Sequence, residues 1–307
     1  MATRQIAFLY PGQGSQHAGM GAELLEDAEV ADLAQRCSID VDLRYLLTEA
    51  DDEELKLTEH AQPALCFTGI ALTLLLRRDG IEPAATAGHS VGEYAALAAA
   101  RAIEPEDAVA TVVERGHAMA EAVPAGETGL SAVLGLDPEA VVEAIGSIDD
   151  CWPANYNTPT QTVIGGSLTA LDEAARTLKE AGARRVVSLN VSAAFHTPVV
   201  APAAERLRRR LDTVSWRQPD RPVMSNLSGS PYPTDARFPD ALERQLKSPV
   251  RWSDCVHALH ELGATDFVEV GPKRALTGML RELAPRAGGH SVASPAAVEG
   301  LAARLIQ

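Results

Sequence analysis

Residues 88–94 read Gly88-His89-Ser90-Val91-Gly92-Glu93-Tyr94 and join a short apolar segment, 84–87, to an alanine-rich segment, 94–100. The Gly-x-Ser-x-Gly pattern between a predicted strand and a predicted helix is typical of a nucleophile elbow, in which glycines permit a sharp turn that exposes the serine hydroxyl. The free N–H groups at the start of the helix can stabilise an oxyanion there. The alternative is a turn that only caps a helix, and the pattern alone does not decide between the two.

Predicted strands and helices alternate on both sides of this turn. Strands are predicted at 5–10, 223–227 and 266–270, and helices at 22–37, 62–79, 105–120, 198–211 and 273–283. This alternation indicates an α/β fold with a largely parallel sheet. Residues 284–299, rich in Gly, Ala, Pro and Ser, are predicted to be a loose tail before a short final helix.

The segment 127–192 follows a different order. Strands are predicted at 130–136, 152–156, 161–164 and 185–191, with helices at 138–145 and 168–181. The order strand–helix–strand–strand–helix–strand is that of the split βαβ or ferredoxin-like unit. We therefore expect an α/β-hydrolase-like large subdomain formed by 1–126 and 193–307, with a ferredoxin-like small subdomain, 127–192, inserted into it.

Composition and charge exclude several classes of function. The chain has 307 residues and a net charge of −15, which argues against nucleic acid or an anionic membrane as the main partner. One basic cluster stands out, and it is either a docking patch or a solvated helix face. It consists of Arg206, Arg208, Arg209 and Arg210.

The cysteines are widely scattered at positions 37, 66, 151 and 255, with no Cys-x-x-Cys pair. The sequence therefore predicts neither a metal site nor a disulfide framework. It shows no signal peptide and no apolar run of the ~20 residues that span a bilayer. We expect a cytoplasmic protein.

Two arrangements of serine chemistry fit the elbow. An α/β-hydrolase triad would use Ser90, Asp266 and His290 in that chain order. The alternative is a Ser90–His196 dyad, in which the histidine takes the serine proton. Thr197 is predicted to cap the helix that follows His196. The positive end of the dipole of this helix would keep the His196 ring neutral.

Arg115 lies at the edge of the apolar stripe of the helix that begins at Pro105. An arginine at this position can bury its stem and present its guanidinium to a cleft. The alternative is a surface arginine that serves no site.

Seven segments of the chain match one known family, in the same order. They are Tyr-Pro-Gly-Gln-Gly-Ser-Gln (10–16), Gly-His-Ser-Val-Gly-Glu-Tyr (88–94), Glu-Arg-Gly-His-Ala-Met (114–119), Asn-Tyr-Asn-Thr-Pro-Thr-Gln (155–161), Ala-Phe-His-Thr (194–197), Arg-Gln-Leu-Lys-Ser-Pro-Val-Arg-Trp (244–252) and Glu-Val-Gly-Pro (269–272). Over residues 5–283 the chain resembles malonyl-CoA:acyl carrier protein transacylases and the related acyltransferases of polyketide synthases.

The resemblance implies that Ser90 is the acylated nucleophile and His196 its general base. The backbone N–H groups of Gln13 and Val91 would form the oxyanion hole. The Ser90–His196 dyad is accordingly favoured over the triad with His290.

The resemblance also implies substrate-binding roles. Arg115 would bind the free carboxylate of a malonyl-type group, because a planar guanidinium grips a carboxylate with two hydrogen bonds. Gln245 would orient the histidine ring through its backbone carbonyl. Phe195 matches the malonyl-selecting pattern, although the small Ala193 and Ala194 before it leave the size of the acyl group open.

Three further positions match the family without a chemical role. Asn155 and Asn157 are interpreted as structural or cleft-lining residues, and His89 as a support of the elbow. Lys273 departs from the family, which usually has glycine there, and we expect only a surface effect.

The implied reaction is ping-pong transfer of malonyl from CoA to the phosphopantetheine thiol of an acyl carrier protein, in fatty-acid or polyketide synthesis. We expect a monomer with no bound cofactor and no metal. The alternatives are a trans-acting acyltransferase that moves a larger acyl group between carrier proteins, an acyl-carrier-protein hydrolase, and a non-catalytic docking subunit.

Overall fold

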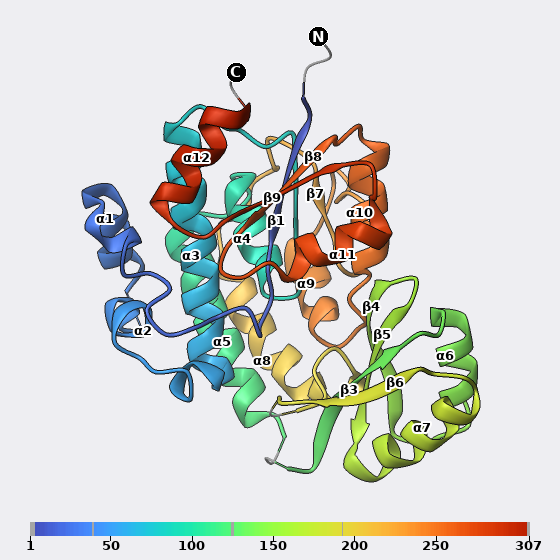
Figure 1. Cartoon of the computed structure of the whole chain (residues 1–307). Helices are drawn as coiled ribbons and strands as arrows, with labels where there is room; N and C mark the ends of the chain where they lie inside the picture. Colours follow the sequence, from blue (N-terminus) through green and yellow to red (C-terminus); the bar gives the residue numbers. More distant parts are fainter. Residues whose placement is uncertain (1–3, 39, 124–125, 192, 306–307) are drawn as a thin grey trace.

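Parallel strands form the central sheet. In the computed structural model, which describes residues 4–38, 40–123, 126–191 and 193–305, this is a five-stranded sheet with the order β7-β2-β1-β8-β9 (Figure 1). Its strands are β1 (Ile6–Tyr10), β2 (Ala85–Gly88), β7 (Val223–Met224), β8 (Asp266–Val270) and β9 (Gly288–Val292). Each neighbouring pair is parallel, so the carboxyl ends of all these strands lie at one edge.

Helices cover both faces of this sheet, and the side chains of β1 are therefore buried on both sides. Phe8 and Tyr10 join one apolar cluster, and Ala7 and Leu9 join another. The first cluster is closed by α1 (Ala28–Cys37), α2 (Leu43–Thr48), α3 (Thr58–Arg78), α4 (Gly92–Ala99), α5 (Pro105–Glu121), α8 (Ala201–Leu211), α9 (Phe238–Leu246) and α12 (Pro295–Leu305). The second is closed by α10 (Trp252–Glu261) and α11 (Ala275–Leu283).

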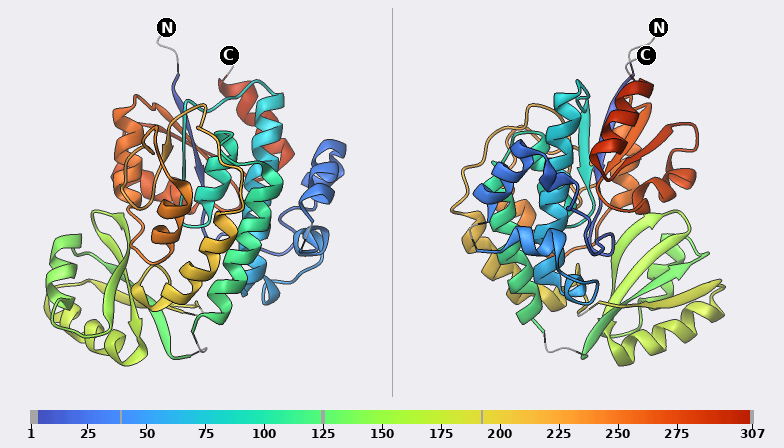
Figure 2. Two further views of the ribbon diagram at one scale, coloured as in Figure 1. Left: turned by 180° about the vertical axis from the view of Figure 1, so that it is seen from behind. Right: turned by 60° about the vertical axis from the view of Figure 1, so that its left-hand side comes forward.

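A second, antiparallel sheet stands beside the first, as Figure 2 shows from two sides. It has the order β4-β5-β3-β6, with α6 and α7 packed on one face. Its elements are β3 (Thr128–Leu134), α6 (Pro138–Ile145), β4 (Cys151–Thr158), β5 (Gln161–Ser167), α7 (Leu168–Glu180) and β6 (Arg185–Leu189). This is the ferredoxin-like topology, so the predicted fold class is confirmed.

Side-chain caps start both helices of the small subdomain. The Asp137 carboxylate accepts a hydrogen bond from Ala140 N at the start of α6, and the Ser167 hydroxyl accepts one from Ala170 N at the start of α7. The small subdomain is joined to the segment before α10, where Tyr156 N of β4 donates to Val250 O over 2.8 Å and Val250 N donates to Ala154 O over 2.9 Å.

Several helix boundaries in the large subdomain differ from the predictions, and α8 and α11 begin at Ala201 and Ala275, two or three residues later than predicted. The helix predicted over 22–37 is interrupted, because the Asp27 carboxylate accepts hydrogen bonds from Glu29 N and Val30 N and so starts α1 afresh. A short 3-10 turn, Leu24–Glu26, precedes it. The helix predicted from 62 begins at Thr58.

The prediction of a loose tail over 284–299 is wrong. Residues Gly288–Val292 form β9, which pairs in parallel with β8 along its whole length. Glycine-rich composition hid this strand, because β9 is an edge strand that contributes one fully buried side chain, Val292. The helix α12 then packs Val298 and Leu301 into the core.

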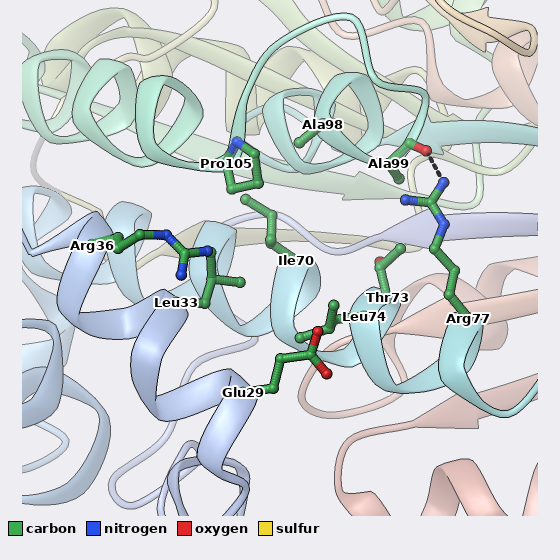
Figure 3. A pocket seen from close by; sticks show the side chains of 10 residues that line it. All are labelled: Glu29, Leu33, Arg36, Ile70, Thr73, Leu74, Arg77, Ala98, Ala99 and Pro105. Carbon is green, nitrogen blue, oxygen red and sulfur yellow. Dashed lines mark hydrogen bonds between the residues drawn. The ribbon is translucent and has the colours of Figure 1, made fainter.

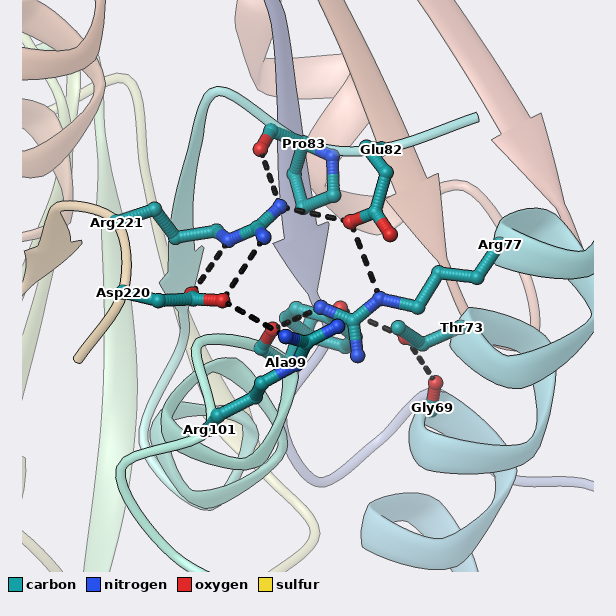
Figure 4. Close-up of polar contacts among 10 residues, drawn as sticks. Gly69, Thr73, Arg77, Glu82, Pro83, Ala99, Arg101, Asp220 and Arg221 are labelled. Atoms are coloured by element: carbon teal, nitrogen blue, oxygen red, sulfur yellow. Dashed lines mark hydrogen bonds and ion pairs between the residues drawn. The ribbon is translucent and has the colours of Figure 1, made fainter. Parts of the chain in front are cut away.

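An ion-pair cluster fastens the connections that enter β2 and β7, at the opposite edge from the elbow (Figure 4). The Arg221 guanidinium contacts the carboxylates of Glu82 and Asp220 and donates to Pro83 O over 2.7 Å. Arg77 Nε also binds Glu82, at 3.1 Å. The Arg221 side chain is only 15% exposed, so these contacts are partly shielded from water. None of the described helices combines the length and the apolar character that crossing a membrane requires.

We expect Arg221→Ala to lower the free energy of unfolding by about 2 kcal/mol, because it removes a largely buried guanidinium that binds the partly buried Asp220, Glu82 and the Pro83 carbonyl. Urea denaturation followed by circular dichroism measures the change. Arg237→Ala is the matched control, because the Arg237 side chain is 80% exposed. This variant should lose about 0.5 kcal/mol or less of unfolding free energy. Equal losses in both variants would contradict a stabilising role for the cluster.

Candidate active site

The turn between β2 and α4 is a nucleophile elbow in its backbone geometry. Ser90 has φ +53°, in the left-handed region that non-glycine residues rarely adopt. The glycines are required by close approach: a Cβ on Gly88 would lie 1.9 Å from Gly92 C, and one on Gly92 would lie 2.2 Å from Tyr10 O. The sequence pattern and the backbone therefore agree on a strained turn that presents Ser90.

His196 lies beside Ser90, although the small subdomain separates them along the chain. Ser90 Oγ and His196 Nε2 are 2.7 Å apart, and His196 Nδ1 is 3.0 Å from the backbone carbonyl of Gln245. Because a carbonyl can only accept, Nδ1 carries the proton and Nε2 is free to accept from the serine hydroxyl. The geometry is that of a base held ready by a third group.

The His196 ring is neutral for a different reason from the one predicted. The residues after it form a three-residue 3-10 turn, Pro198–Val200, and the Thr197 hydroxyl donates to Ala194 O and does not cap it. Burial, assisted by the positive charge of Arg115, lowers the pKa of His196 to about 3. Desolvation therefore keeps the imidazole uncharged.

Arg115 is buried more deeply than its sequence position predicts, with only 1% of the residue exposed. Its Nη1 donates to Gln62 Oε1 over 2.6 Å, and its Nη2 lies 3.1 Å from Ser90 Oγ. The guanidinium also stands 5.9 Å from the centre of the Tyr94 ring. Within the described chain no carboxylate lies within ion-pair distance of it, and its Nε has no hydrogen-bond partner. The hydrogen bonds of this buried cation next to the serine go to neutral groups only.

The two predicted oxyanion donors come from different loops, and both residues line the cavity at Ser90. Val91 follows the serine in the elbow, and Gln13 lies in the loop after β1. In the part of the chain that the structure describes, neither backbone N–H donates to a protein acceptor. The Gln13 side chain is bound elsewhere, because its Oε1 accepts a hydrogen bond of 2.8 Å from the Thr58 hydroxyl.

A cavity of about 150 Å³ opens at Ser90 between the two sheets. It is lined by Gln13, Val91, Arg115, Phe195 and His196 from the large subdomain and by Leu130, Asn155 and Leu189 from the small one. The buried Phe195 ring forms part of its wall. This volume is below the ~300 Å³ at which sites for drug-sized ligands begin, so it suits a short acyl group.

A network beneath the elbow was not predicted from the sequence. Asn226 accepts a hydrogen bond from Ser90 N and donates one to Gly88 O, each over 2.7 Å. The carboxylate of Glu93 accepts from Asn226 N over 3.2 Å, from Gln245 Nε2 over 3.1 Å and from the Tyr232 hydroxyl. These contacts hold both sides of the strained turn. The only sequence signal was Glu93 itself, a charged residue at the start of an apolar helix.

His89 and Asn157 connect the elbow to the small subdomain. His89 Nε2 lies 3.0 Å from Asn157 Oδ1, and the His89 ring stands 5.5 Å from that of Trp252. Burial lowers the pKa of His89. This placement agrees with supporting roles for both residues.

The alternative triad is not assembled. His290 Nε2 does contact Asp266 Oδ1, at 3.0 Å, but Asp266 pairs with Ile6 at the amino end of β1. Ser90 follows the carboxyl end of β2, where Gly88 pairs with Tyr10. At 3.3 Å per residue the two ends are about 13 Å apart.

A second hollow lies away from this chemistry, between α1, α3 and the start of α5 (Figure 3). It is mainly apolar and carries Arg36 and Arg77 at its ends. Arg36 and Arg77 pair with Glu106 and Glu82. It brings together no nucleophile and base.

Other predicted features are surface or core elements. Arg206, Arg208 and Arg210 pair with carboxylates of neighbouring segments, so they belong to a paired helix face. The four cysteines are buried and free. Among the described residues, no cluster of three His, Cys, Asp or Glu side chains is arranged to hold a metal ion.

Comparison with known proteins places the chain in a family. A family model for the acyl transferase domain matches residues 7–304. The chain belongs to the acyl transferase family. It is 42% identical over 303 residues to the malonyl CoA-acyl carrier protein transacylase of Bacillus subtilis (strain 168), which covers 96% of this chain and 95% of the relative. The resemblance seen in the sequence is thereby confirmed.

Solved structures agree with this assignment of an acyltransferase. The malonyl CoA-acyl carrier protein transacylase from Clostridium perfringens superposes with a TM-score of 0.94 at 35% identity, over 98% of this chain and 97% of that one. A malonyl-transacylase in complex with a type II polyketide synthase acyl carrier protein gives 0.90 at 33% identity, over 98% and 99%.

The buried Glu93 of this acyltransferase makes its stability depend on pH. Burial raises the pKa of Glu93 from 4.5 to about 7. The folded state therefore holds this proton to higher pH than the unfolded state, so the associated stability is full below pH 4.5 and is lost as the pH rises to about 7. At 1.4 kcal/mol per pH unit the loss is about 3 kcal/mol.

We expect Glu93→Gln to gain about 3 kcal/mol of unfolding free energy relative to the wild type between pH 4.5 and pH 7.5. Urea titrations at several pH values measure this difference, in which the opposing contribution of His196 cancels because both proteins contain it. Glu180→Gln, at an exposed position, should show a constant difference from the wild type. A constant difference for Glu93→Gln as well would refute the assignment.

Proposed function

We propose that the protein transfers a malonyl group from malonyl-CoA to the phosphopantetheine thiol of an acyl carrier protein, with Ser90 as the intermediate acyl acceptor. One observation carries the proposal. The Ser90 hydroxyl lies between the base nitrogen of His196 and the buried guanidinium of Arg115, which has no acidic partner in the described chain. A site of this kind is complementary to an acyl group that ends in a carboxylate.

The first half-reaction forms an ester on Ser90. Its Oγ attacks the thioester carbonyl while the proton passes to His196 Nε2, and the oxyanion is stabilised by the N–H groups of Gln13 and Val91. When the intermediate collapses, the C–S bond breaks and the CoA thiolate takes the proton from the imidazolium. The Gln245 carbonyl holds the ring in one orientation throughout.

The second half-reaction reverses these steps with a different thiol. The phosphopantetheine S–H gives its proton to His196 and attacks the Ser90 ester. The malonyl group leaves on the new thioester, and Ser90 Oγ recovers the proton. The dyad and the backbone donors supply all of this chemistry, so the proposed reaction uses no resident cofactor.

Arg115 favours malonyl in two ways. An uncharged acyl group leaves the buried guanidinium unpaired, which costs binding energy. In addition, Arg115 is one cause of the low pKa of His196. A bound carboxylate offsets that positive charge and so makes His196 a stronger base when a malonyl group is present.

One chain supplies all the residues of the proposed site, and its cysteines are free thiols. We propose a monomer, because Ser90, His196, Arg115 and Gln245 all come from one chain and meet within it. The buried free thiols are compatible with the cytoplasm, where thiols stay reduced.

Intact-mass spectrometry tests the proposal. Incubation with malonyl-CoA should add one malonyl group, which a carrier protein bearing phosphopantetheine then removes. Ser90→Ala should abolish the adduct, and His290→Ala should retain it. An adduct formed only with a long or uncharged acyl donor would support instead the transfer of larger acyl groups between carrier proteins. Rapid loss of the adduct to water, without transfer, would support the hydrolase.

We expect Arg115→Ala to slow malonylation of Ser90 by about 100-fold, while acetylation from acetyl-CoA holds or rises, because only the malonyl group loses a charge-assisted partner. Single-turnover rates with the two donors measure the ratio. Arg115→Lys is the matched variant, which keeps the charge and loses bidentate binding. Equal losses with both donors would remove Arg115 from the carboxylate role.

A further inference from the structure

Lys273 has an unfavourable backbone conformation in the turn between β8 and α11. Its φ is +62°, a region that favours glycine. The Nζ of Lys273 donates to the carbonyl of Gly14 over 2.8 Å, and Gly14 lies in the loop that follows β1. The sequence predicted only a surface effect for Lys273. The structure shows a further contact, because this side chain reaches the loop that carries Gln13.

This loop, residues 11–16, needs restraint from outside. Gln13 is flanked by Gly12 and Gly14, and Gly14 has φ +102° with open space around it. From the side of α3, the Thr58 hydroxyl binds Gln13 Oε1, and Gln16 Nε2 donates to the carbonyl of Leu55 over 2.9 Å. Gln16 Oε1 also accepts a hydrogen bond from Gly14 N over 2.8 Å. These contacts hold the two glutamine side chains and the Gly14 N–H, and they leave the Gly14 carbonyl to a partner from the other side.

The turn that carries Lys273 is itself well anchored. The Glu269 carboxylate accepts hydrogen bonds from Leu276 N and Thr277 N, over 3.0 and 2.8 Å, at the start of α11. The Ser291 hydroxyl donates to the carbonyl of Lys273 over 3.1 Å. The ammonium group is therefore presented from a fixed support.

We infer that Lys273 is a positioning residue for the oxyanion hole, and that its bond to the Gly14 carbonyl restrains the loop backbone two peptide units after the Gln13 N–H. The inference rests on the proposed acyl transfer through Ser90. A charge-assisted hydrogen bond to a carbonyl restrains a glycine-flanked peptide more firmly than a neutral one does. Since an oxyanion donor must be aligned to about half an ångström, a loose loop slows acylation without weakening the binding of the donor.

The test compares single-turnover acylation of Ser90 by malonyl-CoA and by malonyl-N-acetylcysteamine, a thioester without the phosphates of CoA. Lys273→Met should slow both reactions by about 10-fold, less than the 100-fold or more expected for losing an oxyanion donor outright, with KM little changed. Lys273→Arg, which keeps a charged donor, should stay within about threefold of the wild type. Lys179→Met, at an exposed position of α7, is the control for loss of a positive charge.

Lys273→Gly separates positioning from stability. It removes the strain of the left-handed conformation, so Tm should hold or rise while acylation slows as in Lys273→Met. Unchanged acylation, or acylation and Tm that fall together in both variants, would overturn the inference. A loss confined to malonyl-CoA would also overturn it and assign Lys273 to the CoA phosphates. Failure of the proposed function is a separate result, in which the wild-type chain forms no malonyl ester with either donor.

Discussion

The active site depends on the contact between Gly88, Gly92 and the carbonyl of Tyr10, where no side chain fits. It places the start of α4 against the ends of β1 and β2, and it leaves Ser90 in a left-handed conformation. The bonds of Asn226 to Ser90 N and Gly88 O hold this conformation, which would otherwise relax. The serine is therefore positioned by backbone packing, and the groups around it are arranged to meet it.

A buried carboxyl group and a buried guanidinium lie close to Ser90, and Gln245 contacts both of them. Its Nε2 donates to the Glu93 carboxylate, and its Oε1 faces Arg115 at 3.5 Å. Without this amide the two charges would be free to pair and neutralise each other. With it, the carboxylate is satisfied inside the protein, and the guanidinium keeps binding capacity toward the cavity. The site thus has a positive charge available for a ligand although the chain as a whole is acidic.

Sequence patterns predicted the α/β fold, the ferredoxin-like unit and the residues that the structure gathers at Ser90, because each depends on local periodicity or on a motif. The roles of these residues in the reaction are proposed. The helices α9 and α10 were not predicted, and neither was the contribution of Asn226. That contribution arises from a contact between residues far apart in the chain, which no local pattern encodes. The edge strand β9 was missed because pairing, and not hydrophobicity, defines it.

The group that orients His196 is a main-chain carbonyl, that of Gln245. Every amino acid supplies such a carbonyl, so the third member of the proposed catalytic arrangement is encoded by the path of the chain at the end of α9 and not by a side chain. Substitutions at position 245 would alter the contacts to Glu93 and Ser90 while leaving the acceptor in place. Mutational scanning would therefore not detect this part of the machinery, and only a change that shifts the end of α9 would remove it.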